Sequence, residues 1–146
     1  MSDLRSYISQ IKKINELKTI KSPVSTKYEI AGITAKVDGS DAVLFEKIKE
    51  SDFKLIANLV GTRKRFAIAV GGTENTIHEK VISAIKKAKK PKIISSGKFM
   101  ENKSKNLLSM PIVTHFEKES GPFITSSVAY AKNPETGKQN SSFHRM

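Results

Sequence analysis

Two polar residues, Asn140 and Arg145, have the types and the spacing to contact both ends of an extended ligand. They flank the stretch SSFH, whose small residues leave room for a ligand to approach. Five steps along a strand cover about 17 Å, at ~3.3 Å per residue. The odd spacing places the two side chains on opposite faces of an ideal strand, so we expect a bulge or a strand end to re-aim one of them. By itself the pair leaves two alternatives open, a ligand site and two solvated polar residues.

The other residues with chemical potential have ordinary structural explanations. Gly71-Gly72 precedes a predicted helix and could bind phosphate through free backbone amides. Its spacing fits neither a P-loop nor a dinucleotide fingerprint, so a simple turn is favoured. Glu117 and Glu119 lie in a polar stretch, where paired carboxylates are usually solvated. The three histidines are far apart in the sequence and form no metal-binding triad there: His78, His115 and His144.

The strongest global feature is positive charge, with 26 Lys and Arg residues against 14 Asp and Glu and a formal net charge of +12. Such an excess favours an anionic partner, whether nucleic acid, a phosphate-bearing ligand or an acidic protein. The densest run, KKAKKPK at 86–92, follows a predicted helix, where the helix dipole favours cations. Because no zinc-finger, RNP-type or basic-zipper motif accompanies the run, a solvated helix end is favoured over nucleic-acid contact.

Length and composition are typical of a soluble globular protein. The 146 residues are enough for one ordinary core, and they contain 38% hydrophobic and 27% charged residues. The absence of cysteine excludes disulfides and thiolate metal sites. No apolar run approaches the ~20 residues needed to cross a bilayer. Because MSDLRSYISQ also lacks the apolar core of a signal peptide, we expect a cytoplasmic location and no membrane contact.

The first half of the chain predicts alternating helices and strands. A helix is expected from Asp3 to about Leu17, with Leu4, Ile8, Ile11 and Ile14 on one stripe, followed by the strand LKTI. Thr26 and Glu29 have the spacing of a capping box that opens a second helix, with Ile30, Ile33 and Val37 facing inward. AVLFEKI (42–48) and FKLIANLV (53–60) are predicted strands.

Two further helices and a polar linker are predicted next. Thr62 is expected to cap a short helix over 63–70, and Thr76 with Glu79 to open a helix that runs to about Lys89, with Ile77, Val81, Ile82 and Ile85 inside. Pro91 is expected to end that helix, and 92–100 to form a strand. The polar stretch at 101–106 predicts a linker, so we divide the chain into 1–106 and 107–146.

From residue 107 onward the helical pattern disappears, and strands are predicted between Pro111 and Arg145. The segment 123–132 is rich in Ile, Thr, Val and Tyr, as β-strands are. Pro134 presets the second position of a type I turn, and Gly137 supplies the positive φ that closes it. The sequence therefore predicts a hairpin that turns at Asn133 to Gly137.

Several blocks in a fixed order resemble the amino-terminal part of UbiD-type decarboxylases. They are DLRSYI, ELKTIKSPVSTKYEIAGIT, AVLFEKIK, NLVGTRKRFAIAVG, MPIVTHFEKESGPFITSSVAYAKNPETGK and QNSSFHRM, and the last two are the most specific. The resemblance implies an α/β (α+β) fold, in which an amino-terminal α/β domain is followed by the first strands of a flavin-binding split β-barrel. It also implies a carboxy-lyase that acts on unsaturated or aromatic acids with prenylated FMN, held through its phosphate by a divalent metal, usually Mn²⁺, with K⁺ nearby.

The resemblance carries three site residues onto this chain. Asn140 matches the family's metal-ligand asparagine, whose amide oxygen suits a hard ion such as Mn²⁺. Arg145 matches the arginine that binds the substrate carboxylate, and Thr125 matches a threonine that lines the cofactor pocket. We expect Asn140 and Arg145 to face a common cleft through a local distortion between Ser141 and His144.

The departure from the family is length, because its members are roughly three times longer. Their other metal ligands and the proton-donating glutamate match no position of this chain, so the resemblance implies that the chain is catalytically incomplete alone. We expect a complementary chain or a second copy as partner, and a small carboxylic acid as substrate. A phosphorylated anhydromevalonate, used by some archaeal relatives, is one candidate. The alternative is a stand-alone basic module that binds nucleic acid or an acidic protein.

Overall fold

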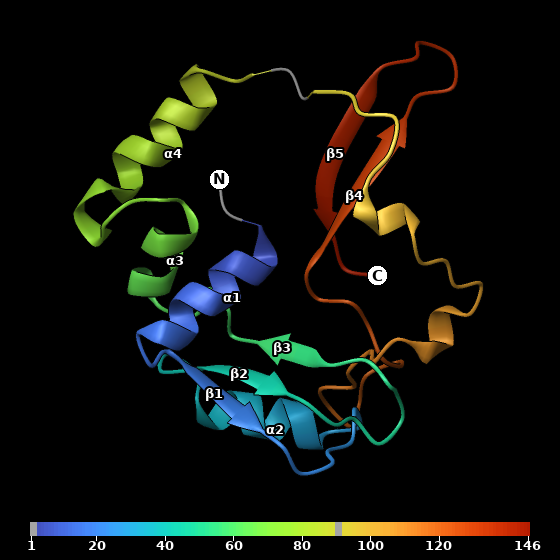
Figure 1. Cartoon of the computed structure of the whole chain (residues 1–146). Coiled ribbons are helices and arrows are strands. Elements are labelled where there is room, and N and C mark those ends of the chain that lie inside the picture. The colour runs from blue at the N-terminus through green and yellow to red at the C-terminus, as the bar shows by residue number, and fades with distance from the viewer. Residues whose placement is uncertain (1–2, 90–91) are drawn as a thin grey trace.

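A computed structural model describes residues 3–89 and 92–146 (Figure 1). Helices come first, interleaved with three short strands, and a two-stranded hairpin comes last. The elements are α1 (Leu4–Lys13), β1 (Leu17–Ile20), α2 (Glu29–Lys36), β2 (Ala42–Phe45), β3 (Leu55–Ala57), α3 (Arg63–Ala69), the 3₁₀ turn η1 (Glu74–Thr76), α4 (Ile77–Lys86), the 3₁₀ turns η2 (Lys98–Met100) and η3 (Leu107–Ser109), β4 (Ser127–Lys132) and β5 (Gln139–His144).

The three amino-terminal strands form one mixed sheet in the order β1-β2-β3. β1 runs parallel to β2, with Leu17 opposite Ala42, and β3 runs antiparallel to β2, with Leu55 opposite Phe45. The strands predicted at these positions are thus confirmed, although β2 and β3 are shorter than the apolar runs that encode them.

Helices cover both faces of this sheet because the side chains of β2 alternate between two cores (Figure 1). Val43 and Phe45 pack with Ile30 of α2 on one face. Ala42 packs with Tyr7 and Ile11 of α1 on the other face. The result is a helix–sheet–helix sandwich, which we call the α/β unit and define as residues 3–70.

Helix α1 is shorter than its apolar pattern predicts. Asp3 caps it by accepting a 2.9 Å hydrogen bond from the Ser6 backbone N–H. Of the predicted stripe, Ile11 is fully buried, whereas Leu4 and Ile14 are exposed. The helix ends at Lys13 because Ile14 and then Asn15, which has a positive φ, turn the chain into β1.

The capping box predicted at Thr26 and Glu29 is wrong. Glu29 is itself the first residue of α2, and its carboxylate accepts a 2.7 Å hydrogen bond from the backbone N–H of Ser25. Thr26 instead donates its N–H to Glu50, a residue of the loop that follows β2. A contact that is distant in sequence therefore replaces the local cap, and of the three predicted inward residues only Ile30 is fully buried.

A buried arginine ties the helices to the sheet. Thr62 caps α3 as predicted, by accepting from the Arg65 N–H at 3.2 Å. The Arg65 side chain is completely buried, and its guanidinium donates to Glu16 at 2.8 Å, to the Asn58 carbonyl at 3.1 Å and to the Ser40 carbonyl. Hydrogen bonds from Lys64 and Arg65 lower the pKa of Glu16.

Helix α4 departs from its prediction at both ends. Thr76 makes no side-chain cap, because its hydroxyl closes a box with Thr73 one turn earlier. Only Ile77 is buried, while Val81, Ile82 and Ile85 become progressively more exposed as the helix leaves the α/β unit. The helix ends at Lys86, before the predicted Lys89, and its expected stop at Pro91 lies outside the described residues.

The strand predicted over 92–100 is wrong, because this segment carries only the turn η2 and its Ile93 and Ile94 side chains are exposed. Residues 111–126 form no extended strand either. They are instead held to the α/β unit through Thr114, whose backbone exchanges hydrogen bonds with Thr26 and Tyr28, and through Val113 in the core.

None of the described helices is long and apolar enough to cross a membrane.

The carboxyl-terminal strands form a separate antiparallel hairpin, with an unbroken register from Ser127 opposite His144 to Lys132 opposite Gln139. The predicted turn is confirmed. Asn133 accepts side-chain hydrogen bonds from the amides of Glu135 and Thr136, and Gly137 has a φ of 67°. α4 and this hairpin both rise from the side of the sheet that carries α1 (Figure 1). The fold is thus mixed α and β, as predicted, and its second sheet is not a closed barrel.

Candidate functional site

Asn140 lies on a hairpin face made of small and polar side chains. It is opposite Ala131 in the register, and its i+2 and i+4 neighbours on the same face are Ser142 and His144. The Ser142 hydroxyl lies 2.8 Å from His144 Nε2. All of β5 is exposed, so the amide oxygen of Asn140 is available to a ligand that approaches this face.

The opposite face of the hairpin carries its three large apolar side chains, beside Lys132, Gln139 and Ser141. Val128 and Phe143 are direct cross-strand partners, and Tyr130 pairs with Ser141 beside them. Their exposed fractions are 46% for Val128, 88% for Phe143 and 72% for Tyr130. The hairpin therefore has the alternation of a strand pair with one face meant for burial, but the described residues do not bury that face.

Arg145 lies just beyond β5, in a small cluster of its own. Its guanidinium carbon is 3.6 Å from the ring centroid of Phe123, and its Nη2 is 3.8 Å from Oε1 of Glu119. Phe123 stacks in turn on His115, with ring centroids 5.1 Å apart and planes at 25°. A hollow of about 340 Å³ is lined by Glu119, Phe123 and Arg145, together with Ser120 and Met146.

The hairpin register shifts by one residue immediately before this cluster. Ser127 is opposite His144, but Ile124 and Met146 exchange both of their backbone hydrogen bonds and are directly opposite each other. Three steps on one strand thus face two on the other, which leaves Thr125 and Ser126 opposite Arg145. That count defines a β-bulge. The distortion predicted between Ser141 and His144 is wrong, because the irregularity lies on the facing segment.

Thr125 borders a larger groove between this bulge and the α/β unit. The groove has a volume of about 1050 Å³. It is lined by α2, by β3 and the loop that follows it, and by residues 110–113, 115–116 and 123–126. Two buried polar atoms in its wall, Thr34 Oγ1 and His115 Nδ1, have no hydrogen-bond partner among the described residues. Most of the groove's lining is apolar. These two polar atoms are therefore the hydrogen-bonding groups that its wall leaves unused.

The structure therefore places the three predicted site residues around the hairpin but not in one pocket. Thr125 lines the large groove and Arg145 the small hollow, while Asn140 lies on the exposed face of β5 and lines neither. Sequence reasoning missed Phe123 and the pairing of Glu119 with Arg145. No local pattern in the sequence indicates this cluster, because it forms only when residues 119–124 pair with the chain after β5.

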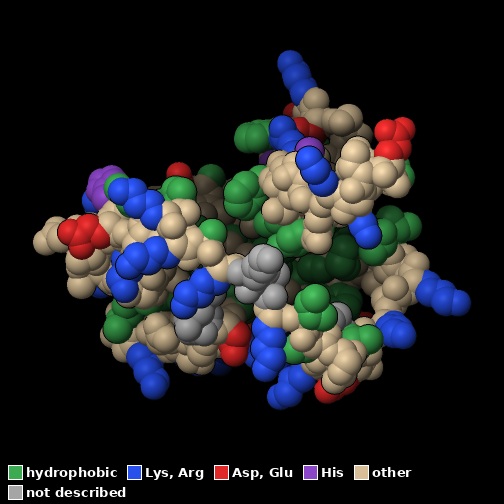
Figure 2. Space-filling model, turned by 90° about the horizontal axis from the view of Figure 1, so that it is seen from above, with side chains coloured by type: hydrophobic (Ala, Val, Ile, Leu, Met, Phe, Trp, Pro, Cys, Tyr) green, Lys and Arg blue, Asp and Glu red, His purple; other side chains and the backbone are tan. Residues whose placement is uncertain are grey.

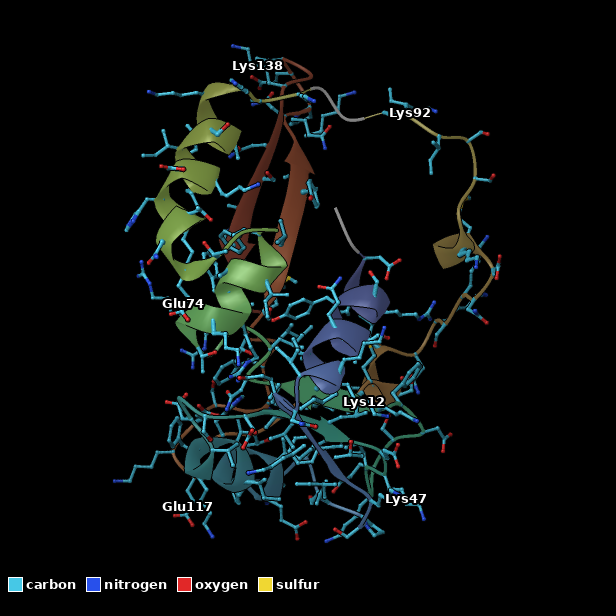
Figure 3. The ribbon with its side chains drawn as sticks, turned by 60° about the vertical axis from the view of Figure 1, so that its left-hand side comes forward. Lys12, Lys47, Glu74, Lys92, Glu117 and Lys138 are labelled. Carbon is cyan, nitrogen blue, oxygen red and sulfur yellow. The ribbon has the colours of Figure 1, made fainter. Side chains whose placement is uncertain are left out.

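The other candidates have structural roles. Gly71 and Gly72 end α3, where their amides donate to Ile68 and Ala67 in a Schellman arrangement, so these amides are not free for phosphate. Glu117 points away from the body beside α2 (Figure 3). No group of three or more His, Asp or Glu side chains that could hold a metal ion occurs within 3–89 and 92–146.

Positive charge is spread over the face of the molecule that Figure 2 shows. Figure 2 shows Lys and Arg side chains distributed around a face that is hollowed and lined by hydrophobic side chains, without one dense cationic patch. In Figure 3, Lys138 at the hairpin turn and Lys12 on α1 project from well-separated parts of the molecule. On this face the distribution does not resemble a continuous phosphate-binding stripe.

Two family models match the chain and together cover nearly all of it. The model of the 3-octaprenyl-4-hydroxybenzoate carboxy-lyase N-terminal domain matches residues 8–85. The model of the Rift-related domain of the same carboxy-lyase matches residues 86–146. The models meet between residues 85 and 86, whereas the sequence predicts a domain boundary near residue 106, and that boundary stays a prediction.

Curated relatives include two archaeal decarboxylases. The chain is 28% identical over 143 residues to the anhydromevalonate phosphate decarboxylase of Methanothermobacter thermautotrophicus, a match that covers 98% of this chain and 33% of the relative. It is 30% identical over 144 residues to the enzyme of the same name from Methanosarcina mazei, covering 97% of this chain and 32% of the relative. The chain thus spans about a third of the length of these relatives.

Solved structures show the same fold. An evolved dimeric form of the UbiD-class enzyme HmfF from Pelotomaculum thermopropionicum, in complex with prFMN, matches with a TM-score of 0.90 at 28% identity, over 99% of this chain and 35% of that one. The same enzyme in complex with FMN matches with a TM-score of 0.89 at 28% identity, over 97% of this chain and 33% of that one.

Proposed function

The chain belongs to the UbiD family, and on that premise we propose that it is the amino-terminal portion or small subunit of a (de)carboxylase that uses prenylated FMN. The observation that carries the proposal is the coincidence of the family match with the hairpin and bulge, which hold Asn140, Thr125 and Arg145. The substrate class is an unsaturated or aromatic carboxylic acid, and the chain is catalytically inactive without the remaining part of the family's fold.

The side chains present fit a phosphate-bearing cofactor with a metal. Asn140 offers a neutral amide oxygen from an exposed strand face of small residues, and that atom is a hard ligand for Mn²⁺. Thr125 contributes a hydroxyl at the bulge, beside the large groove. When bound, prenylated FMN would supply the electron sink for decarboxylation. None of these side chains is assigned to K⁺, which residues of the completed site would bind.

Arg145 would bind the substrate carboxylate. Its guanidinium has five N–H donors in a fixed planar fork, which suits bidentate contact with a carboxylate. Binding at that position would hold the substrate at the reactive ring, and correct placement is worth a large part of a catalysed reaction's rate. Anhydromevalonate phosphate, the substrate named for two relatives, is the first acid to test.

The partner is a polypeptide that supplies the rest of the UbiD fold, or a second copy of this chain. Two features support this proposal: β5 has an outer edge free of any further strand within the described part of the chain, and the apolar hairpin face with Phe143 is exposed. An edge strand of this kind is a template for pairing with another chain.

Reconstitution tests the proposal. The chain is co-expressed with the remaining two-thirds of the Methanothermobacter relative as a separate polypeptide, in cells that make prenylated FMN. We expect the two to co-purify with flavin absorbance, and Asn140→Ala to lower flavin and manganese content. Asn102→Ala, at an exposed loop position, is the matched control. Arg145→Ala should keep the flavin and lose turnover. Full flavin content and activity in both site variants would reject the site assignment.

The second candidate is a basic binding module for nucleic acid or an acidic protein, and the net charge of +12 is the observation that favours it. Its signature is binding to single- or double-stranded nucleic acid that weakens steeply with salt, because phosphate contacts release counterions. Micromolar binding to an oligonucleotide at 0.15 M salt, with no flavin in the reconstituted complex, would favour this candidate over the decarboxylase.

A further inference from the structure

We propose that Glu119, Phe123 and His115 are positioning residues, which hold the guanidinium of Arg145 ready for a carboxylate. The inference rests on the proposed role of Arg145, and it adds three side chains to that role. Each belongs to residues 115–123, a segment that passes between the α/β unit and the hairpin.

Contact with an aromatic ring restricts the guanidinium of Arg145. Arg145 lies with its central carbon 3.6 Å from the Phe123 ring centroid, within the range of a cation–π contact. The His115 ring stacks on the same Phe123 ring, with the two ring centroids 5.1 Å apart. Because Arg145 carries a long side chain that is 66% exposed, it would otherwise sample many rotamers, and the stack restricts them.

Glu119 fixes the direction in which the guanidinium points. Its Oε2 accepts a 3.0 Å hydrogen bond from the His115 backbone N–H, and its side chain is only 13% exposed, so this carboxylate is held in place. Its Oε1 lies 3.8 Å from Nη2 of Arg145, which is an ion-pair distance but too long for a hydrogen bond. Glu119 therefore attracts one edge of the fork and leaves its N–H donors available to a second carboxylate.

The bulge brings the two segments together. Ile124 and Met146 pair through both backbone hydrogen bonds, and Thr125 and Ser126 occupy the extra step opposite Arg145. This pairing sets Phe123 and Arg145 next to each other at the end of the hairpin. The positioning cluster is therefore specified by backbone register as well as by side-chain contacts.

Side-chain NMR of the isotopically labelled full chain tests the proposal without any cofactor or substrate. We expect the δ-methylene protons of Arg145 to resonate upfield of those of Arg63, because the Phe123 ring current shields them. Phe123→Leu should abolish that upfield shift, and Phe123→Tyr should restore it. The amide spectrum of residues 3–70 serves as the folding control for every variant.

The charge of Glu119 and the stacking of His115 on Phe123 are tested in the same spectra. Glu119→Gln keeps the acceptor for the His115 N–H but removes the charge, and it should lower the heteronuclear NOE at Arg145 Nε. Glu117→Gln, two residues away on an exposed side chain, is the matched control and should leave the NOE unchanged. His115→Ala should weaken the upfield shift, whereas His115→Phe should keep it. An unshifted Arg145 in the wild-type chain, or equal NOE values in the two glutamate variants, would overturn the proposal.

A carboxylate probe connects the cluster to function. In the reconstituted complex, Glu119→Gln and Phe123→Leu should each raise the dissociation constant of benzoate several-fold while flavin content stays at the wild-type level. Tighter benzoate binding in Glu119→Gln would mean that Glu119 blocks Arg145 instead of positioning it, and would overturn the inference. A complex that never holds flavin would count against the proposed function alone, because the NMR results are independent of it.

Discussion

The α/β unit and the hairpin are stabilised in different ways, although both are built from short elements. In the α/β unit, Phe45, Val43 and Ile11 are essentially inaccessible to water, and a buried guanidinium joins three loops. In the hairpin no side chain is fully buried, and the last buried residue of the chain is Val113. The α/β unit is stabilised by buried hydrophobic cores. In the hairpin the large apolar side chains stay exposed.

This contrast assigns the candidate site to the less stable region. Asn140, Thr125 and Arg145 all lie on or beside the hairpin, and an isolated two-stranded hairpin is marginal in water. Binding surfaces are commonly drawn from the low-stability part of a protein, because they gain their contacts when a ligand or partner arrives. The difference in local stability between the α/β unit and the hairpin is therefore the quantity to measure.

Hydrogen exchange should show the largest difference. The amides of β2 exchange only when the α/β unit unfolds, which for an ordinary domain takes about 5 kcal/mol or more, so their protection should be on the order of a thousandfold or higher. The amides of β5 should exchange nearly freely, because the hairpin can open without disturbing the core. Exchange measured by NMR at single-residue resolution checks this.

Adding the completing polypeptide provides the matched experiment. Protection of β5 should rise toward that of β2 when its apolar face and outer edge are covered, and protection of β2 should change little. Equal protection of the two strands in the chain alone would contradict the comparison, because it would place the hairpin in the same cooperative unit as the sheet.

Removal of the buried guanidinium should have the next largest effect. Arg65→Ala leaves the Ser40 carbonyl without a donor, and the Asn58 carbonyl keeps only the Gly61 N–H. It also leaves Glu16 with only its surface partner Lys64. Loss of one partner from a buried pair costs about 3 kcal/mol or more, which urea denaturation followed by far-UV circular dichroism can measure.

Two control variants make the Arg65 result specific. Arg63→Ala, at an exposed position two residues earlier, should cost at most about 1 kcal/mol. Phe143→Ala, in the hairpin, should change the free energy of unfolding by less than about 0.5 kcal/mol because that ring is 88% exposed. A loss of several kcal/mol in Phe143→Ala would mean that the hairpin contributes to the main unfolding transition.

Local patterns predicted most of the fold correctly. The strands β1, β2 and β3, the Thr62 cap and the turn at Asn133 to Gly137 all depend on residues within a few positions of one another. The failures came where distant residues compete. Glu50 takes the backbone N–H of Thr26, and Val81 and Ile85 carry an apolar stripe that the described residues do not cover.

The candidate site shows the same limit. The odd spacing of Asn140 and Arg145 predicted a distortion on their own strand, which is wrong. Parity on one strand cannot tell which of two paired strands contains an extra residue. The bulge at Thr125 and Ser126 is visible only once Ile124 is known to pair with Met146. For the same reason the contact between Arg145 and Phe123 could not be found from sequence alone.

Two glycine substitutions provide the smallest effects, and they should have opposite signs in the two regions. Gly137 has a φ of 67°, and a Cβ there would meet only the Lys132 side chain, at an ordinary 3.7 Å. The penalty of Gly137→Ala therefore comes from the backbone, at about 1 kcal/mol for an L-residue in the left-handed region. Gly32 lies inside α2 with open space around it, so Gly32→Ala should stabilise the α/β unit by about 0.5–1 kcal/mol through helix propensity.

The two measurements separate the regions because each substitution acts on one of them. Gly137→Ala should weaken the cross-strand NOEs between Ala131 and Asn140 while the urea midpoint of the α/β unit stays within error. Gly32→Ala should raise that midpoint and leave the hairpin NOEs unchanged. If Gly137→Ala lowered the midpoint by as much as Gly32→Ala raises it, the turn would be coupled to the core. The two regions would then unfold together, and the candidate site would be more rigid than its exposure indicates.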